Sequence, residues 1–144
     1  MRGFLSEIRV ALEPGALPVL ALVILLVPLR WILAWTLSVF IHEIGHLLAV
    51  GIMGIPVYRI SFGASGARIE TGPMEPSQEV WCALAGPLAG AGLVFLGCWL
   101  PMTAVCAFFH TIVNCLPLGN LDGGRVARCL LRKIPCKPKQ ERVQ

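Results

Sequence analysis

Residues 40–50 read FIHEIGHLLAV, and this stretch places His42, Glu43 and His46 inside an otherwise apolar run. A charged side chain near the centre of a membrane-spanning helix costs about 2.5–3.5 kcal/mol on insertion scales. Ionisable groups inside membrane segments are rare and usually functional. The question is therefore what holds these three polar groups, and a bound dication would offset their cost.

His42 and His46 are four residues apart, so on a helix both imidazoles project from one face and can reach a single metal ion. Glu43 lies beside them in the pattern H-E-x-x-H, in which the glutamate acts on water at the metal rather than binding the metal itself. Zinc suits nitrogen and oxygen ligands, and a catalytic zinc keeps a fourth position open. The pattern therefore predicts a hydrolytic zinc site.

Other interpretations fit the same residues. A chance H-E-x-x-H on a helix surface is disfavoured, because this apolar run offers no solvated face. A proton or ion relay also buries histidine and glutamate in a membrane, and this alternative stays open. A di-iron bundle would use Glu43-x-x-His46, but it needs a second Glu-x-x-His on another helix, and the sequence contains no second copy.

A third metal ligand is expected in residues 114–124, NCLPLGNLDGG, because two histidines leave a zinc site incomplete. Asp122 is the acidic residue of this segment, and Pro117 with the neighbouring glycines interrupts the helix around it. Irregular backbone at membrane depth is tolerated inside protein or beside a wet cavity. Asp122 can also cap the basic helix that follows, and the two roles are compatible. If the helix that carries the two histidines and the helix that carries Asp122 both end at the cytoplasmic surface, the rise per residue places the histidines and Asp122 at the same depth, roughly 15 Å.

The composition indicates an integral membrane protein. Of 144 residues, 56% are hydrophobic and 14% are charged, whereas globular chains are nearer half and a quarter. The six cysteines form no C-x-x-C pair and lie mostly in apolar segments, which argues against a secreted disulfide framework and favours buried thiols. We predict one all-α membrane domain over residues 1–144 with about four transmembrane helices, the last of them discontinuous. The expected spans are 16–29, 31–53, 79–100 and 102–131.

The basic residues predict the orientation of the chain. With four spans, every Lys and Arg except Arg30 falls on one side, which the positive-inside rule assigns to the cytoplasm together with both termini. Residues 1–15 are expected as an amphipathic helix on the membrane surface. The basic tail, 132–144, is expected to anchor to anionic lipid rather than to bind nucleic acid. Residues 57–70 alternate around a Gly/Ser turn, which indicates a small membrane-associated β-hairpin or a plain linker.

Two further features concern the interior of the helix bundle. Gly86 and Gly90 are four residues apart, a spacing that lets membrane helices approach closely. His110 lies one helical turn before Asn114 and can line the site. The commoner role for such a histidine is a hydrogen bond inside the bundle, and a ligand role is the less favoured alternative.

Together these residues resemble the site-2 protease family of intramembrane zinc metalloproteases. The family pairs H-E-x-x-H with a later N-x-x-P-x-x-x-L-D-G, and both motifs are complete here, as His42, Glu43, His46, Asn114, Pro117, Leu121, Asp122 and Gly123. The resemblance implies that His42, His46 and Asp122 bind zinc. It also implies that Glu43 is the catalytic base and that Asn114 holds the substrate or its oxyanion. The segment AGPLAG, residues 85–90, resembles the third-span motif of the family.

The resemblance covers about residues 31–131. The 144 residues contain no PDZ or CBS domain, which many members carry, and they are most similar to the compact bacterial branch that includes sporulation sigma-factor processing proteases. An accessory domain of that branch is missing too. The partners implied are membrane lipid and a transmembrane substrate, such as an anti-sigma or pro-sigma factor, in a bacterial cell membrane.

The sequence therefore predicts a zinc-dependent intramembrane endopeptidase that cleaves a membrane-embedded protein near the cytoplasmic leaflet. The alternative from another class is a non-catalytic metal- or proton-binding membrane module. The two differ in whether Glu43 is needed for function.

Overall fold

The computed structural model describes residues 9–12, 14–63 and 66–131. Residues 1–8 of the expected surface segment and the basic tail lie outside the described residues. The elements in chain order are β1 (Arg9–Leu12), α1 (Ala16–Leu26), α2 (Leu29–Ile52), β2 (Val57–Gly63), β3 (Gly66–Thr71), α3 (Pro76–Phe95), α4 (Pro101–Cys115) and α5 (Asp122–Leu131).

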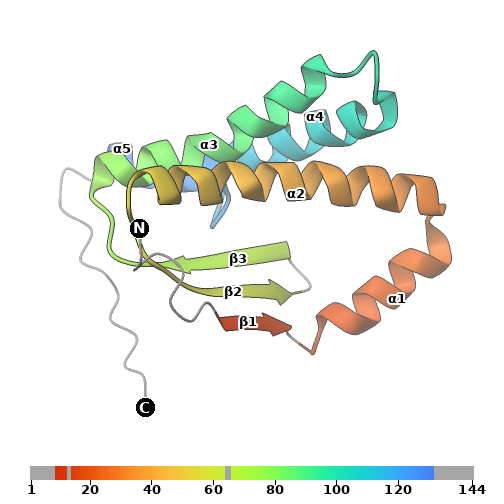
Figure 1. Cartoon of the computed structure of the whole chain (residues 1–144), viewed down its shortest axis with the longest axis horizontal. Coiled ribbons are helices and arrows are strands. Elements are labelled where there is room, and N and C mark those ends of the chain that lie inside the picture. Colours follow the sequence, from red (N-terminus) through yellow and green to blue (C-terminus); the bar gives the residue numbers. More distant parts are fainter. Residues whose placement is uncertain (1–8, 13, 64–65, 132–144) are drawn as a thin grey trace.

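Helices α2, α3 and α4 pack against one another, and α5 packs mainly against α3 (Figure 1). The three strands form a small sheet beside this bundle. Helix α1 connects the sheet to the start of α2 and buries none of its residues. Helices α2, α3, α4 and α5 therefore form one packed bundle, and α1 lies outside it.

The crossing of α2 and α3 depends on a glycine inside the H-E-x-x-H motif. A Cβ atom on Gly45 would stand 2.5 Å from the Ala85 carbonyl oxygen and 2.8 Å from the Ala89 methyl carbon. No side chain fits in that space, so the two backbones approach as closely as small residues allow in membrane helices. This contact turns the histidines on either side of Gly45 toward α3.

The chain breaks between α4 and α5, as the sequence predicted. Leu116 has the extended conformation, with φ −64° and ψ 137°, and it precedes Pro117. Proline disfavours helical geometry in the residue before it, so α4 ends there. The chain resumes as a helix at Asp122. The break brings this acidic residue into the bundle at the start of a new helix.

The predicted β-hairpin is present as β2 and β3. The two strands pair antiparallel, with Ile60 opposite Ile69 and Ser61 opposite Arg68. Val57 on β2 joins Val50, Ile55 and Cys82 in a buried cluster, which fixes the sheet against α2 and α3. The alternative of a plain linker is therefore wrong.

Strand β1 corrects the expectation of a surface helix for residues 9–12 of the segment 1–15. Residues 9–12 form a strand that pairs parallel with β2, with Val10 opposite Ile60. The free edge of β2 offers backbone hydrogen bonds to these residues. Tertiary pairing therefore decides the conformation here, and the apolar spacing counted along the sequence does not.

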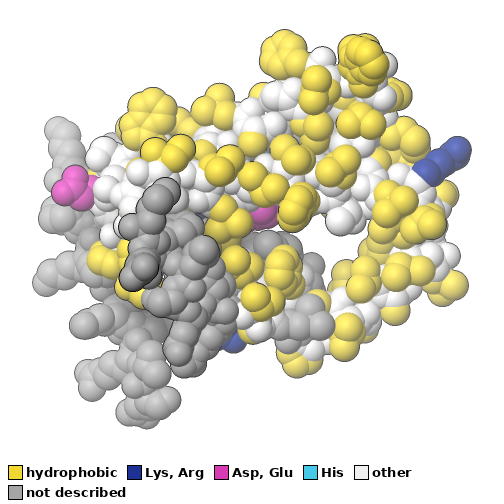
Figure 2. All heavy atoms as spheres, viewed as in Figure 1, with side chains coloured by type: hydrophobic (Ala, Val, Ile, Leu, Met, Phe, Trp, Pro, Cys, Tyr) yellow, Lys and Arg dark blue, Asp and Glu magenta, His cyan; other side chains and the backbone are white. Residues whose placement is uncertain are grey.

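The outer surface of the bundle is apolar. Large side chains are strongly exposed, among them Ile52 (86%), Phe95 (87%) and Trp99 (82%), and hydrophobic side chains spread over the helices in Figure 2. Apolar patches of this extent mark contact with lipid or with another protein. By length and composition, α2 and α3 can each cross a membrane. Helices α1 and α4 are apolar but have 11 and 15 residues, so four spans remain a prediction.

Candidate metal centre

Three side chains from two distant parts of the chain meet inside the bundle. His42 and His46 project from α2, Asp122 is the first residue of α5, and all three are buried. His42 Nε2 lies 3.0 Å from Asp122 Oδ2 and 3.2 Å from His46 Nε2. His46 Nε2 lies 3.2 Å from the same carboxylate oxygen. The structure thus brings together the residues that the two sequence motifs contributed separately.

This triangle of atoms has the dimensions of a zinc site. A tetrahedral zinc ion with ligand distances of about 2.0–2.1 Å keeps neighbouring ligand atoms about 3.3–3.4 Å apart. The three separations here, 3.0, 3.2 and 3.2 Å, are only slightly shorter. Two nitrogens and one oxygen match the donor set of catalytic zinc sites, which leave a fourth position open. Among the described residues, these are the ones whose ligand atoms cluster closely enough to share an ion.

His46 is oriented to bind a metal through Nε2. Its Nδ1 lies 2.8 Å from the carbonyl oxygen of Cys82 on α3. A carbonyl only accepts hydrogen bonds, so Nδ1 carries a proton and Nε2 is the ring nitrogen that faces the centre. Metal-binding histidines commonly have such a partner, which fixes both the tautomer and the orientation of the ring.

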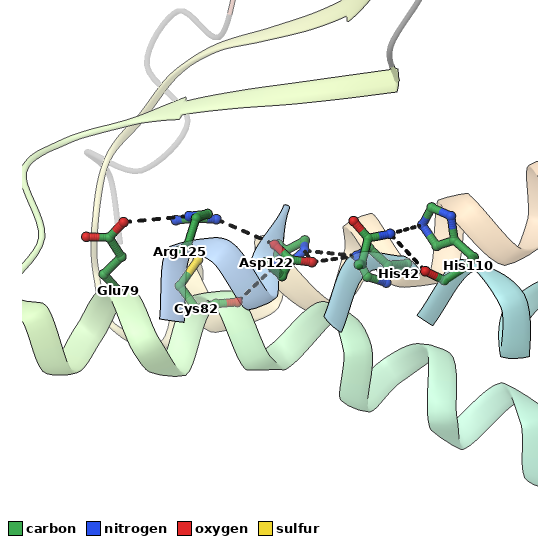
Figure 3. A network of polar contacts seen from close by, with 8 residues as sticks. His42, Glu79, Cys82, His110, Asp122 and Arg125 are labelled. Atoms are coloured by element: carbon green, nitrogen blue, oxygen red, sulfur yellow. Dashed lines mark hydrogen bonds and ion pairs between the residues drawn. The ribbon is translucent and has the colours of Figure 1, made fainter. Parts of the chain in front are cut away.

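The Asp122 carboxylate contacts a basic residue on its other side. Arg125 lies 3.8 Å from Asp122 Oδ1 and 3.7 Å from Glu79 of α3, so a chain of charges leads from Glu79 to the centre (Figure 3). Asp122 is also in the first turn of α5, where the helix dipole favours a negative charge. Sequence reasoning missed the role of Arg125, although its spacing of three residues from Asp122 was a usable signal.

Glu43 is half-buried beside the centre. It follows His42 directly on α2, and its carboxylate interacts electrostatically with His42, His46, Asp122 and Arg125. It is not part of the cluster of possible ligand atoms. This separation between the glutamate and the three possible ligands fits a carboxylate that handles protons instead of binding the ion.

Asn114 and His110 form a second polar group on α4. The Asn114 amide nitrogen donates to the His110 carbonyl oxygen at 3.0 Å and to His110 Nε2 at 3.1 Å. The His110 ring packs edge-on against His42, with 4.6 Å between ring centres. His110 therefore connects Asn114 to the centre, as a hydrogen-bonding residue and not as a member of the cluster of ligand atoms.

A mostly apolar cavity of about 350 Å³ lies between α3 and α5 and borders the centre at Asp122. It is large enough for several side chains of a peptide segment. The lining residues are Ala83, Leu84, Pro87, Cys115, Asp122, Gly123, Val126, Ala127 and Leu130.

Comparison with known proteins identifies a fold. No protein-family model matches the sequence, and a search of curated proteins finds no significant match. Among solved structures, the chain is similar to the site-2 protease from Methanocaldococcus jannaschii, with a TM-score of 0.66 over 89% of this chain and 70% of that chain. The sequences are 19% identical. The chain therefore has the fold of a site-2 protease.

Proposed function

We propose that this protein is a zinc-dependent intramembrane endopeptidase that cleaves a membrane-embedded protein near the cytoplasmic leaflet. The observation that carries the proposal is the buried triangle of His42, His46 and Asp122, with separations of 3.0–3.2 Å. Its position at a helix break inside an apolar bundle and the fold of a site-2 protease support the same conclusion.

The residues around the triangle fit peptide hydrolysis. A zinc ion held there would supply a Lewis acid, which activates water and polarises a peptide carbonyl. Glu43 takes a proton from the attacking water and passes it to the departing amine nitrogen. The amide nitrogen of Asn114 already donates to two atoms of His110, so its carbonyl oxygen is the group that accepts a hydrogen bond from a substrate N–H.

The substrate must be extended at the bond that is cut, because a helix screens its carbonyl groups. Among the described residues, β3 pairs with β2 on one side only, so its other edge can add a strand. The apolar cavity beside Asp122 suits side chains of a membrane segment. The resemblance to the compact bacterial branch makes an anti-sigma or pro-sigma factor the first substrate to test.

The location follows from the same features. We place the protein in a bacterial cell membrane with both termini in the cytoplasm, since the basic residues gather on that side of a four-span arrangement. The 11 residues of α1 rise roughly 16 Å, about half the hydrocarbon thickness, so α1 crosses only with its flanking residues or where the bilayer thins.

Glu43→Gln tests the proposal. The amide keeps the size of the side chain but cannot accept the proton, so cleavage of a tagged single-span substrate should stop while the purified protein keeps one zinc ion per chain. Glu75→Gln is the matched control, because Glu75 is exposed at the start of α3, where an amide oxygen can still cap the helix. Unchanged cleavage by Glu43→Gln would contradict the role that we assign to Glu43. Zinc binding by the natural protein without any cleavage would favour the non-catalytic module.

A further inference from the structure

Three buried polar atoms beside the centre lack a hydrogen-bond partner in the described chain. They are Ser38 Oγ, His42 Nδ1 and Thr111 Oγ1. Ser38 and His42 are among the most buried residues, with 1% and 2% of their surface exposed. Buried polar atoms almost always have a partner, so three of them near one metal ligand indicate a shared partner.

The three atoms come from α2 and α4, and two of them, Thr111 Oγ1 and His42 Nδ1, lie beside Gly90 of α3. Ser38 precedes His42 by one turn, so both side chains leave α2 on the same face. A Cβ atom on Gly90 would collide with Thr111 Oγ1 and would stand 3.8 Å from His42 Nδ1. Because Gly90 has no side chain, the Thr111 hydroxyl approaches α3 closely on the side where His42 Nδ1 lies.

We propose that Ser38 and Thr111 are positioning residues for His42, and that they hold one buried water molecule against His42 Nδ1. The inference rests on the proposed function, because a neutral histidine that binds through Nε2 carries its proton on Nδ1. The water accepts that proton in a hydrogen bond and donates to the two hydroxyl oxygens. Three partners is the usual number for a buried water.

The two histidines are then held in different ways. His46 has a backbone partner, the Cys82 carbonyl, which no side-chain substitution removes. His42 depends on two hydroxyl groups. Without them its ring can turn, or its proton can move to Nε2, and either change removes the lone pair from the centre. Loss of such an outer partner typically weakens metal binding about 10- to 100-fold.

The test is the zinc affinity of the purified full chain in detergent, measured by competition with a chromophoric chelator. Thr111→Val removes the hydroxyl and keeps the volume, whereas Thr111→Ser keeps the hydroxyl and loses a methyl group. We expect Thr111→Val and Ser38→Ala to bind zinc at least about tenfold more weakly than the natural protein, and Thr111→Ser to bind nearly as well. Thr103→Val is the matched control, because Thr103 is another threonine of α4 and is buried, and its hydroxyl is not among the three atoms without partners.

Each outcome decides the inference. If Thr111 acts only through packing, Thr111→Ser should bind zinc more weakly than Thr111→Val does. That order of zinc affinities would overturn the inference. Equal weakening by Thr103→Val, or zinc affinity of Thr111→Val equal to that of the natural protein, would overturn it too. If the natural protein binds zinc and only the Thr111 effect is missing, the proposed function stands. If the natural protein does not bind zinc, both this inference and the proposed function are wrong.

Discussion

Replacing Gly86 with alanine should place a methyl group inside the candidate metal centre. Gly86 lies on α3, directly opposite the two histidines. A Cβ atom built there would collide with His46 Nε2 and would stand 2.7 Å from His42 Nε2. Both atoms belong to the triangle that we assign to zinc, so this small substitution acts on the centre without changing any of the three ligands.

The size of the effect follows from these distances. Ordinary contacts begin near 3.4 Å, so His42 Nε2 must retreat from 2.7 Å by roughly 0.7 Å. A metal–ligand distance can vary by only about 0.2 Å, so a shift of this size breaks the coordination. We expect zinc affinity to fall by at least about 100-fold, the upper end of the range for changes outside the ligand set. Alanine is also the better helix former, by about 1 kcal/mol, so unfolding of α3 is not the cause.

Gly92→Ala is the control for this experiment. Gly92 lies on the same helix, and a Cβ atom there would meet nothing within 4 Å. Zinc affinity of both variants is measured in detergent by chelator competition, and the thermal stability of both zinc-free proteins is measured by circular dichroism. If Gly86→Ala binds zinc as tightly as Gly92→Ala does, the positions we assign to the histidines are wrong.

Three other outcomes follow from the same structure. Asp122→Asn removes the anionic ligand, so zinc content after dialysis should fall to background while circular dichroism shows an unchanged helix content. His110→Phe removes one acceptor of the Asn114 amide, so cleavage should slow roughly 2- to 10-fold with zinc content unchanged; loss of zinc would instead make His110 a ligand. A fluorescent protein fused to the C-terminus should fluoresce and a fused alkaline phosphatase should be inactive in bacteria, and the reverse result would overturn the assigned orientation.

The sequence was most informative where spacing alone determines geometry. On a helix, the four-residue separation of His42 and His46 can point both rings only to one side. Pro117 and Gly119 interrupt the helix, as the sequence predicted, whereas Gly123 and Gly124 lie inside α5. The prediction that Asp122 meets the two histidines rested on their matching depth and on the family resemblance. In the structure both histidine Nε2 atoms lie within 3.2 Å of Asp122 Oδ2.

Other features depend on contacts that leave little trace in a sequence. Residues 9–12 become a strand because β2, about 50 positions later, offers an edge, and local spacing suggested a helix instead. The partner of His46 is a backbone carbonyl, which every residue has, so nothing in the sequence singles out Cys82. Gly90 suggested close packing of helices, whereas the structure places it beside the Thr111 hydroxyl and the second nitrogen of His42.

X-ray absorption at the zinc edge, on the purified protein in detergent, tests the central claim most directly. We predict one zinc ion per chain with nitrogen and oxygen neighbours alone at about 2.0–2.1 Å, and with the outer-shell scattering of two imidazole rings. The chain has six cysteines, so a different site would have sulfur available. A sulfur neighbour at about 2.3 Å, a single imidazole, or a protein that binds no zinc would contradict the account.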